Sequence, residues 1–479
     1  MFDPRSVRQG LRSASMPEID PHRPRGASRS APDPGGPGEG GSSPEDRRSF
    51  LRAFGPGLLF AGAAVGVSHL VQATRAGAVF GVAMISVVLL ANLVKYPAFR
   101  FGPHYAAATG QPILSGYRRQ GIWTLVAFSL LTLGTMFTVA AAVTVVTAGV
   151  VISVLGLGPI VESTVGAAMG PASVSVLLMV FSAVLLAVGG YPWLDRFMKL
   201  VMPVLILSTL VAMAVTIGRI DWANTSLLPV APLASATGIA FTAAVVGWMP
   251  SAIDISAWSS LWTLARGRQR GRRPQLAGVL LDFDVGYLAT TLLAVAFVLL
   301  GAGVMYGRGI EFKDSASGFA GQVIELYTST LGPWSGPVIG LAALLVMLST
   351  TITVMDGFPR VVAALAAQVR MSAGEDPGRD EHGGAEGDRR VYRIAFAVIA
   401  CGTLAILFFG MSSFKALIDL ATTLSFLTAP VLSWFNHRAV FGAEVPAASR
   451  PGRGMWWWSA VAISLQAAFA AWYLTVIFG

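Results

Sequence analysis

Long apolar runs recur along almost the whole of this 479-residue chain, and they constrain its fold more than any other feature. Hydrophobic residues make up 54% of the chain and charged residues only 12%. A soluble protein would carry about twice as many charged residues. A run of about 20 apolar residues is long enough to cross a bilayer, where only a helix satisfies its own backbone groups. The sequence therefore predicts an all-α polytopic membrane protein that is surrounded by the lipid bilayer.

We expect eleven spans and a cytoplasmic N-terminus. The approximate ranges of the spans are 54–79, 82–101, 122–154, 172–190, 197–217, 234–263, 278–304, 335–359, 391–410, 415–437 and 456–478. Of the 34 Lys and Arg residues, 27 lie in segments that would face one side, five lie in segments that would face the other, and Lys95 and Arg360 lie within spans. This asymmetry predicts a multi-pass protein of the plasma or inner membrane. We expect Lys95 to extend toward the inner interface and Arg360 to pair with Asp356.

Residues 1–52 are rich in Pro, Gly, Ser and Arg and predict a disordered, basic cytoplasmic tail. Such a tail is either an inert linker or a segment that touches anionic lipid headgroups. The net charge of +9 comes mostly from Arg in short loops and the tail, so no nucleic-acid partner is predicted. The single cysteine, Cys401, excludes an intramolecular disulfide. The chain carries no catalytic constellation, cofactor motif or ATP-binding loop, so we expect no enzyme and no cofactor, but transport driven by an ion or proton gradient.

Two spans carry interruptions, "AVGVSHL" at 64–70 and "VVGWMPSAIDISAW" at 245–258. Glycine loosens a helix, and proline removes a backbone donor and frees carbonyls of the preceding turn. The two spans are five apart in order and therefore cross the membrane in opposite directions. Matching interruptions of this kind indicate an inverted-repeat transporter with its site near the midplane. We therefore predict two repeats, 53–217 with spans 1–5 and 233–440 with spans 6–10, followed by an eleventh span at 455–479.

The polar residues at these interruptions have more than one interpretation. Gly66, Ser68 and His69 would line a polar cavity in an unwound segment, or the glycine would allow close helix packing while Ser68 bonds its own backbone. His69 would be a neutral hydrogen-bonded side chain, a proton carrier or a nitrogen ligand. Ser251 and Asp254 have capping-box spacing, so Asp254 would cap the second half of span six alone or would also contact a substrate or proton.

Several motifs occur in the order and spacing of a known family. They are "GPGLLFAGAA" and "RAGAVFG" around span one, "LLANL" and "ATG" in and after span two, "WMPS" in span six, "STTIT" in span eight and "TTLSFLTAP" in span ten. Over about residues 54–440 the chain resembles the Nramp family of divalent-metal transporters. The resemblance implies a LeuT-type fold, a five-plus-five inverted repeat in which spans one and six are broken and an eleventh helix is appended.

The chain departs from this family at the substrate site. Gly66 replaces the metal-binding aspartate of the family's Asp-Pro-Gly-Asn sequence, and His69 replaces its asparagine. Met249 keeps the position of the sulfur ligand, while Ser251 replaces a histidine. The resemblance also implies a carbonyl ligand at Val246 and places Thr422 where span ten commonly has glutamine. The candidate substrate-binding residues are therefore Gly66, Ser68, His69, Val246, Met249, Ser251, Asp254 and Thr422.

The resemblance implies a gradient-coupled secondary transporter of divalent metal cations. Hard divalent ions prefer carboxylate oxygens, and the span-one carboxylate is missing, so the metal selectivity stays open. A set of His69 nitrogen, Met249 sulfur and Asp254 oxygen would suit a softer transition metal. The alternative function is transport of a small organic solute, an amino acid or an amine, on the same scaffold. We expect Arg75 to line or close the outer vestibule in either case.

Overall fold

The computed structural model describes residues 55–479 except 167–169, 272, 310–311, 371–388 and 411–412. The predicted tail at 1–52 and most of the charged loop after span eight lie outside these residues. The described part of the chain consists of helices and connecting segments and contains no β-strand. The all-α fold that the sequence predicts is therefore confirmed.

The first half of the chain contains a broken helix followed by four further crossings. In order, the elements are α2 (Pro56–Ala64), η1 (Ser68–Ala73), α3 (Thr74–Phe80), η2 (Gly81–Ala83), α4 (Met84–Thr109), α5 (Ile113–Gln120), α6 (Ile122–Val154), α7 (Gly158–Val165), α8 (Gly170–Thr216), η3 (Ile217–Arg219) and η4 (Trp222–Asn224). The segments α2, η1 and α3 make up span one, and α4 and α6 are spans two and three.

The second half repeats this order, again beginning with a broken helix. The elements are α9 (Val230–Leu233), α10 (Ala236–Gly247), α11 (Ile255–Gln269), α12 (Leu276–Val304), α13 (Ala316–Leu331), α14 (Ser335–Arg370), α15 (Arg389–Ala405), η5 (Ile406–Gly410), α16 (Phe414–Val440), η6 (Ala447–Ser449) and α17 (Arg453–Phe478). Span six consists of α10 and α11. Spans seven to eleven are α12, α14, α15 with η5, α16 and α17.

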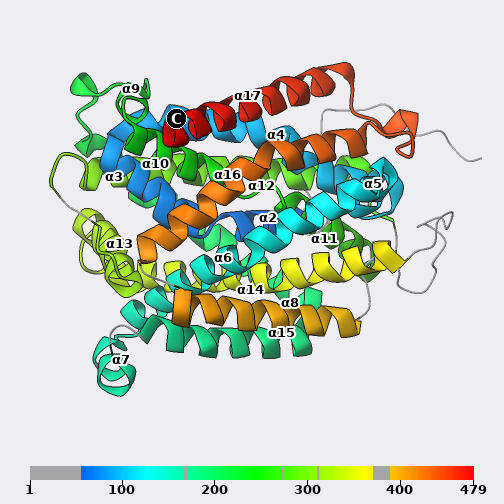
Figure 1. Ribbon diagram of the computed structural model, residues 1–479. Coiled ribbons are helices and arrows are strands. Elements are labelled where there is room, and N and C mark those ends of the chain that lie inside the picture. Colours follow the sequence, from blue (N-terminus) through cyan, green and yellow to red (C-terminus); the bar gives the residue numbers. More distant parts are fainter. Residues whose placement is uncertain (1–54, 167–169, 272, 310–311, 371–388, 411–412) are drawn as a thin grey trace, which may run out of the picture. The chain divides into compact units, whose positions relative to one another are not determined.

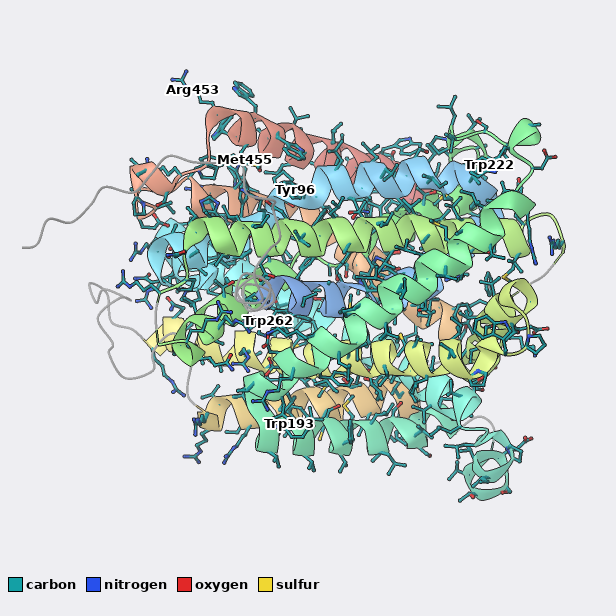
Figure 2. The ribbon with its side chains drawn as sticks, turned by 180° about the vertical axis from the view of Figure 1, so that it is seen from behind. Tyr96, Trp193, Trp222, Trp262, Arg453 and Met455 are labelled. Atoms are coloured by element: carbon teal, nitrogen blue, oxygen red, sulfur yellow. The ribbon has the colours of Figure 1, made fainter. Side chains whose placement is uncertain are left out.

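Nine helices among the described residues are long and apolar enough to cross a membrane, and the broken spans one and six bring the number of crossings to eleven. Large apolar side chains such as Leu90, Leu177 and Phe409 are exposed along the long helices, which is where lipid would contact them. In Figure 2, Arg453 and Trp222 lie at opposite ends of the helices. The predicted number of spans and the two breaks are confirmed.

Spans four and five, Gly170–Val188 and Asp195–Arg219, agree with the two spans predicted at 172–190 and 197–217, and the 47-residue helix α8 joins them. Figure 2 shows two arms of this helix that run in different directions and meet near Trp193. Pro192 lies inside the helix at this point and bends it, because its ring clashes with the preceding turn and its nitrogen donates no hydrogen bond. The chain thus reverses its direction across the membrane without a loop.

Span one lies in the interior of the bundle and contacts span seven backbone to backbone (Figure 1). A Cβ atom on Gly57 would lie 2.0 Å from the carbonyl oxygen of Asp282, and one on Gly286 would lie 2.4 Å from that of Gly57. Gly77 and Gly301 make the same kind of approach at the other half of span one, where a Cβ on Gly77 would lie 1.9 Å from the carbonyl oxygen of Val298. Close packing through small residues therefore holds both halves of span one against α12.

Acidic side chains of α12 and α14 form hydrogen bonds and ion pairs inside the bundle. The Asp282 carboxylate on α12 accepts hydrogen bonds from the backbone N–H groups of Gly55 and Gly57 at 3.1 and 2.9 Å, so it caps α2 instead of its own helix. Asp284, in contrast, pairs with Arg100 of α4 at 3.0 Å. The predicted pair of Asp356 and Arg360 is confirmed, with 2.7 Å between their charged groups.

Candidate functional site

The break in span one begins where α2 ends at Ala64 and continues as the π-helical turn η1 from Ser68. The Ser68 hydroxyl lies within hydrogen-bond distance of the Ala64 carbonyl oxygen and 2.7 Å from Nδ1 of His69. Ser68 therefore bonds its own backbone at the break, as one of the two interpretations of the sequence expects. A π-helical turn inside a longer helix is a frequent mark of a functional site.

Thr350 of α14 fills the space beside Gly66. A Cβ atom at Gly66 would lie between 2.5 and 2.9 Å from the Oγ1, Cγ2 and Cβ atoms of Thr350. The Thr350 hydroxyl lies 3.0, 3.2 and 3.1 Å from the carbonyl oxygens of Gly62, Val65 and Val346, and the first two of these carbonyls are freed where α2 ends. A side chain at position 66, such as the aspartate of the Nramp pattern, therefore has no room in this structure.

The break in span six runs from the end of α10 at Gly247 to the start of α11 at Ile255. Trp248 in this segment donates from Nε1 to the Ser425 hydroxyl of α16 at 2.9 Å. Asp254 occupies the N-cap position of α11, but its carboxylate makes no capping hydrogen bond. The first N–H groups of α11 bond to carbonyls three residues earlier, for example that of Ser256 to Ile253 at 2.9 Å. The capping bond that the spacing of Ser251 and Asp254 predicts therefore does not form.

Lys95, near the middle of α4, reaches the same break from the neighbouring span. Its side chain is 1% exposed, and its Nζ atom donates to the carbonyl oxygens of Val246, Gly247 and Ser251 at 2.7, 2.8 and 3.0 Å. The prediction that Lys95 extends to the membrane interface is wrong. The helix continues to Thr109, past two prolines, so Lys95 lies deeper than the predicted end of span two places it.

A small cavity lies between the two breaks and has a volume of about 30 Å³. At roughly 10–15 Å³ for each water molecule, this is room for about two of them. The cavity is lined by side chains of both broken spans, α6 and α14: Ala63, Ala64, Val67, Ser68, Val139, Val143, Trp248, Ser251, Ala252, Asp254, Ile255, Trp258, Thr350 and Val354. Most of these side chains are apolar, and Asp254 is the one ionisable residue among them.

The Asp254 carboxylate has an unpaired oxygen in this cavity. The residue is 6% exposed, and its Oδ1 atom has no hydrogen-bond partner among the described residues. A buried carboxylate oxygen without a partner costs free energy, because the solvation lost on burial is not replaced. Asp254 and Lys95 interact electrostatically, although their side chains form no ion pair within the described part of the chain. The free oxygen is thus available to a donor from outside the chain.

The structure places His69 beside the cavity but does not include it among the lining residues. Its Nδ1 atom contacts the Ser68 hydroxyl, and its Nε2 atom lies 2.9 Å from the Thr290 carbonyl oxygen on α12. Its ring meets the edge of Phe297 at a centroid distance of 6.4 Å. Both ring nitrogens are therefore engaged, and the imidazole connects span one to span seven.

The remaining candidates lie outside the lining of the cavity. Met249 is fully buried, and the Val246 carbonyl is held by Lys95. The Thr422 hydroxyl of α16 accepts a hydrogen bond from Gln72 at 3.3 Å, and Gln72 in turn accepts one from Arg75 at 3.0 Å. The structure therefore brings Ser68, Ser251 and Asp254 together in the lining of the cavity, with His69 beside Ser68 and the other sequence-predicted residues outside the lining.

Arg75 connects the second half of span one to span ten. Its guanidinium forms an ion pair with Asp419 of α16 at 2.9 Å, and it lies 5.2 Å from the ring centroid of Phe241 on α10. Asp419 was not among the sequence-predicted residues, because nothing in a single sequence pairs positions 344 residues apart. The pair therefore links the second half of span one to span ten, and the expected role of Arg75 at the outer vestibule stays a prediction.

His, Cys, Asp and Glu are the side chains that most often bind metal ions in proteins. The described residues contain no group of three or more of these side chains placed to hold a metal ion. Position 66 has no carboxylate, both nitrogens of His69 are bonded, and the Val246 carbonyl is occupied. Sequence analysis did not place Lys95 or Thr350 at the two breaks, although a lysine inside an apolar span was the available signal for the first.

No family model matches the chain. Among solved structures it resembles MhsT in complex with L-phenylalanine, with a TM-score of 0.60 and 13% identity over 88% of this chain and 98% of that one. It also resembles a mutant of the Eremococcus coleocola manganese transporter, with a TM-score of 0.58 and 13% identity over 91% and 90% of the two chains. Mhp1, a nucleobase-cation-symport-1 family transporter, has a TM-score of 0.52, 14% identity and coverage of 88% and 92%.

These similarities establish a LeuT-type transporter fold, and the expected fold class is confirmed. They do not distinguish a metal from an organic substrate, because transporters of both kinds share the fold. In sequence, the chain is 31% identical over 404 residues to the uncharacterized Pasteurella multocida protein PM0681, covering 83% of this chain and 86% of that protein. The chain therefore has a LeuT-type fold, and it belongs to the same family as Pasteurella multocida PM0681.

Proposed function

We propose that the protein is a gradient-driven transporter of a small organic solute that carries an amino group, an amino acid or an amine. The observation that carries this proposal is the unpaired Oδ1 atom of Asp254 in an otherwise apolar cavity. An ammonium group would satisfy this oxygen with a charge-assisted hydrogen bond, which is about twice as strong as a neutral one. The apolar walls would accept the carbon skeleton of the solute.

A divalent metal, which the resemblance to Nramp transporters implies, is less well supported by the geometry. Such an ion needs several oxygen, nitrogen or sulfur ligands at short range. In the cavity the only charged ligand would be Asp254, and the neighbouring Lys95 ammonium would repel the ion. A dication would leave two uncompensated charges in a region of low dielectric, whereas a zwitterionic amino acid adds no net charge.

The second half of span one supplies a place for the carboxylate of an amino acid. Helical structure begins at Ser68, and both Val67 and Ser68 line the cavity. The N-terminal end of a half-helix carries partial positive charge and exposes N–H groups, which suits an anionic group of a substrate. With a volume of about 30 Å³ the cavity must widen before it holds such a solute. Movement of the half-helices that carry Trp248 and Trp258 would provide this space.

The end of α2 supports a monovalent cation as a coupling ion. Three carbonyl oxygens, of Gly62, Val65 and Val346, lie within 3.2 Å of the Thr350 hydroxyl oxygen. One hydroxyl has one proton and can donate fully to only one of them. A cation placed at the end of α2 would bind the carbonyls of Gly62 and Val65, as carbonyls at the C-terminal ends of half-helices do in transporters of this type.

Uptake into proteoliposomes tests the proposed substrate. We expect flux of a labelled amino acid or amine from a panel, driven by a sodium or proton gradient, and no flux of manganese under the same gradients. Empty liposomes and a gradient-free condition are the controls. Manganese uptake that is saturable and competed by other transition metals, with no organic solute carried, would contradict the proposal and support the metal hypothesis instead.

We also propose that the N-terminus is cytoplasmic, as the distribution of Lys and Arg predicts. Single cysteines at 156–171 and at 371–390, introduced after Cys401→Ser removes the native thiol, test this orientation. We expect an impermeant maleimide to label the first segment in intact cells and the second only after permeabilisation. Labelling of the second segment in intact cells would reverse the topology.

A further inference from the structure

The Lys95 ammonium is bound in the break of span six in the way that a free cation would be bound. All three of its N–H groups donate to backbone carbonyls, of Val246, Gly247 and Ser251, at 2.7 to 3.0 Å. The first two carbonyls belong to the last turn of α10, and the third lies beyond Pro250 in the unwound segment. The ammonium therefore lies at the centre of three carbonyl oxygens, of which only that of Val246 also accepts a backbone hydrogen bond among the described residues, from the Met249 N–H at 3.3 Å.

These carbonyls require a positive partner for two reasons. The last carbonyls of any helix lack intrahelical donors, and the C-terminal end of a helix carries partial negative charge. In span six the helix ends inside the membrane, where water does not supply the missing bonds. None of the ion pairs formed within the described residues involves Lys95, so the carbonyls are its direct partners.

The same structural position in span one has a different occupant. The carbonyls at the end of α2 surround the neutral Thr350 hydroxyl, whereas those at the end of α10 surround the charged Lys95. The two half-helices are corresponding elements of the two repeats. One repeat therefore places a neutral hydroxyl against the carbonyls at its break, and the other provides a cation from the chain itself.

We propose that the break in span six is a monovalent-cation site whose permanent occupant is the Lys95 ammonium. Removal of this side chain should turn the break into a binding site for a free alkylammonium or alkali-metal ion. In the native protein no free cation binds at this position, so any ion coupling must take place elsewhere in the fold. This inference does not depend on the identity of the transported solute.

The surroundings of the lysine stem define the best replacement ligand. The Lys95 side chain borders a mostly apolar pocket between α4, α10, α16 and α17 that has a volume of about 370 Å³ and is also lined by Val246 and Leu465. A Lys95→Ala variant lacks three carbons and the ammonium group. Propylammonium supplies those same four heavy atoms, and its carbon chain would pack along the apolar wall while its charged end reaches the carbonyls.

Thermal unfolding of the purified full-length Lys95→Ala protein tests the proposal without a transport substrate. In choline chloride we expect its Tm to lie about 5 °C or more below that of the native protein, because the carbonyls lose their partner. Propylammonium chloride at the same ionic strength should raise this Tm in a concentration-dependent and saturable way. Ammonium and potassium should raise it less, because they lack the apolar chain.

Two further variants serve as controls in this experiment. Lys95→Met fills the space of the stem without a charge, so it should have a low Tm that no cation raises. Lys199→Ala removes a lysine that pairs with Asp195 at 2.7 Å instead of with carbonyls, and its Tm should not depend on propylammonium. If Lys95→Ala does not survive purification in choline, recovery of monodisperse protein in propylammonium alone supports the proposal. A native Tm for Lys95→Met in choline, equal cation effects on all variants, or loss of Lys95→Ala in both salts would overturn it.

Discussion

Asp254→Asn is expected to abolish solute transport while leaving the protein folded. Asparagine has nearly the same shape as aspartate but lacks the charge that would bind an ammonium group. Loss of one partner of a buried charge pair costs about 2–5 kcal/mol, which corresponds to a loss of roughly thirtyfold or more in flux at low solute concentration. The Oδ1 atom has no hydrogen-bond partner among the described residues, so the substitution removes no hydrogen bond of this atom within the chain. The Tm should therefore fall little or even rise.

Proteoliposome flux and thermal unfolding of the same preparation measure both effects. Asp284→Asn is the matched control, because this carboxylate also belongs to the membrane-spanning part but pairs with Arg100 and accepts a hydrogen bond from Tyr96 at 2.7 Å. It should lower the Tm and leave the apparent solute affinity unchanged. If Asp254→Asn transports normally and unfolds at a lower temperature, Asp254 is a structural residue and the proposed substrate contact is wrong.

Gly66→Asp is expected to destabilise the protein severely and to create no manganese site. The substitution restores the residue of the Nramp pattern, but its Cβ atom would lie within 2.9 Å of three Thr350 atoms. Gly66 lacks a positive φ, so the limit is space rather than backbone conformation. A displaced Thr350 would also lose its hydrogen-bond contacts with the carbonyl oxygens of Gly62 and Val65. We expect a loss of about 3 kcal/mol or more, because a crowded core and a buried unpaired carboxylate act together.

Thermal unfolding and calorimetric titration with manganese test this expectation. A combined Gly66→Asp and Thr350→Gly variant makes room for the carboxylate and should recover part of the lost stability. Gly218→Asp is the control, since a Cβ atom at that exposed glycine would meet nothing within 4 Å. A stable Gly66→Asp protein that binds manganese with high affinity would show that the space beside Thr350 opens readily and that the scaffold retains a latent metal site.

The candidate site was predictable only in part. The sequence indicates both breaks, because glycine, proline and polar residues inside apolar runs are costly unless the helix is interrupted there. It also identifies Ser68, Ser251 and Asp254, which do line the cavity. It does not separate these residues from His69, whose ring bonds the Thr290 carbonyl 221 residues away. Neighbours along one helix share a sequence pattern, but their side chains point to different partners.

The boundaries of the helices were also predictable only in part. Single-sequence patterns locate eleven crossings, yet they predict an end of span two near residue 101 where α4 continues to Thr109. They also predict the two crossings at 172–190 and 197–217, but not that α8 joins these crossings as one helix bent at Pro192. Proline usually ends a helix, but neighbouring helices in a membrane can satisfy the freed carbonyls and let it continue. The local sequence therefore shows where a helix is interrupted, and the packing of neighbouring helices decides whether it ends or bends at that point.

The sequence by itself determined that this protein is a helical membrane protein with interruptions in its first and sixth spans, because burying backbone in hydrocarbon allows few alternatives. Only the tertiary structure decided which groups satisfy those interruptions. Thr350 fills the space beside Gly66, which lies 284 positions earlier in the chain, and Lys95 binds the carbonyl of Val246 from a neighbouring span. Such partners are chosen by the geometry of packed helices, in which a few ångströms decide whether a carbonyl meets a hydroxyl, an ammonium group or an ion. The chemical identity of the site depends on these contacts between distant parts of the chain.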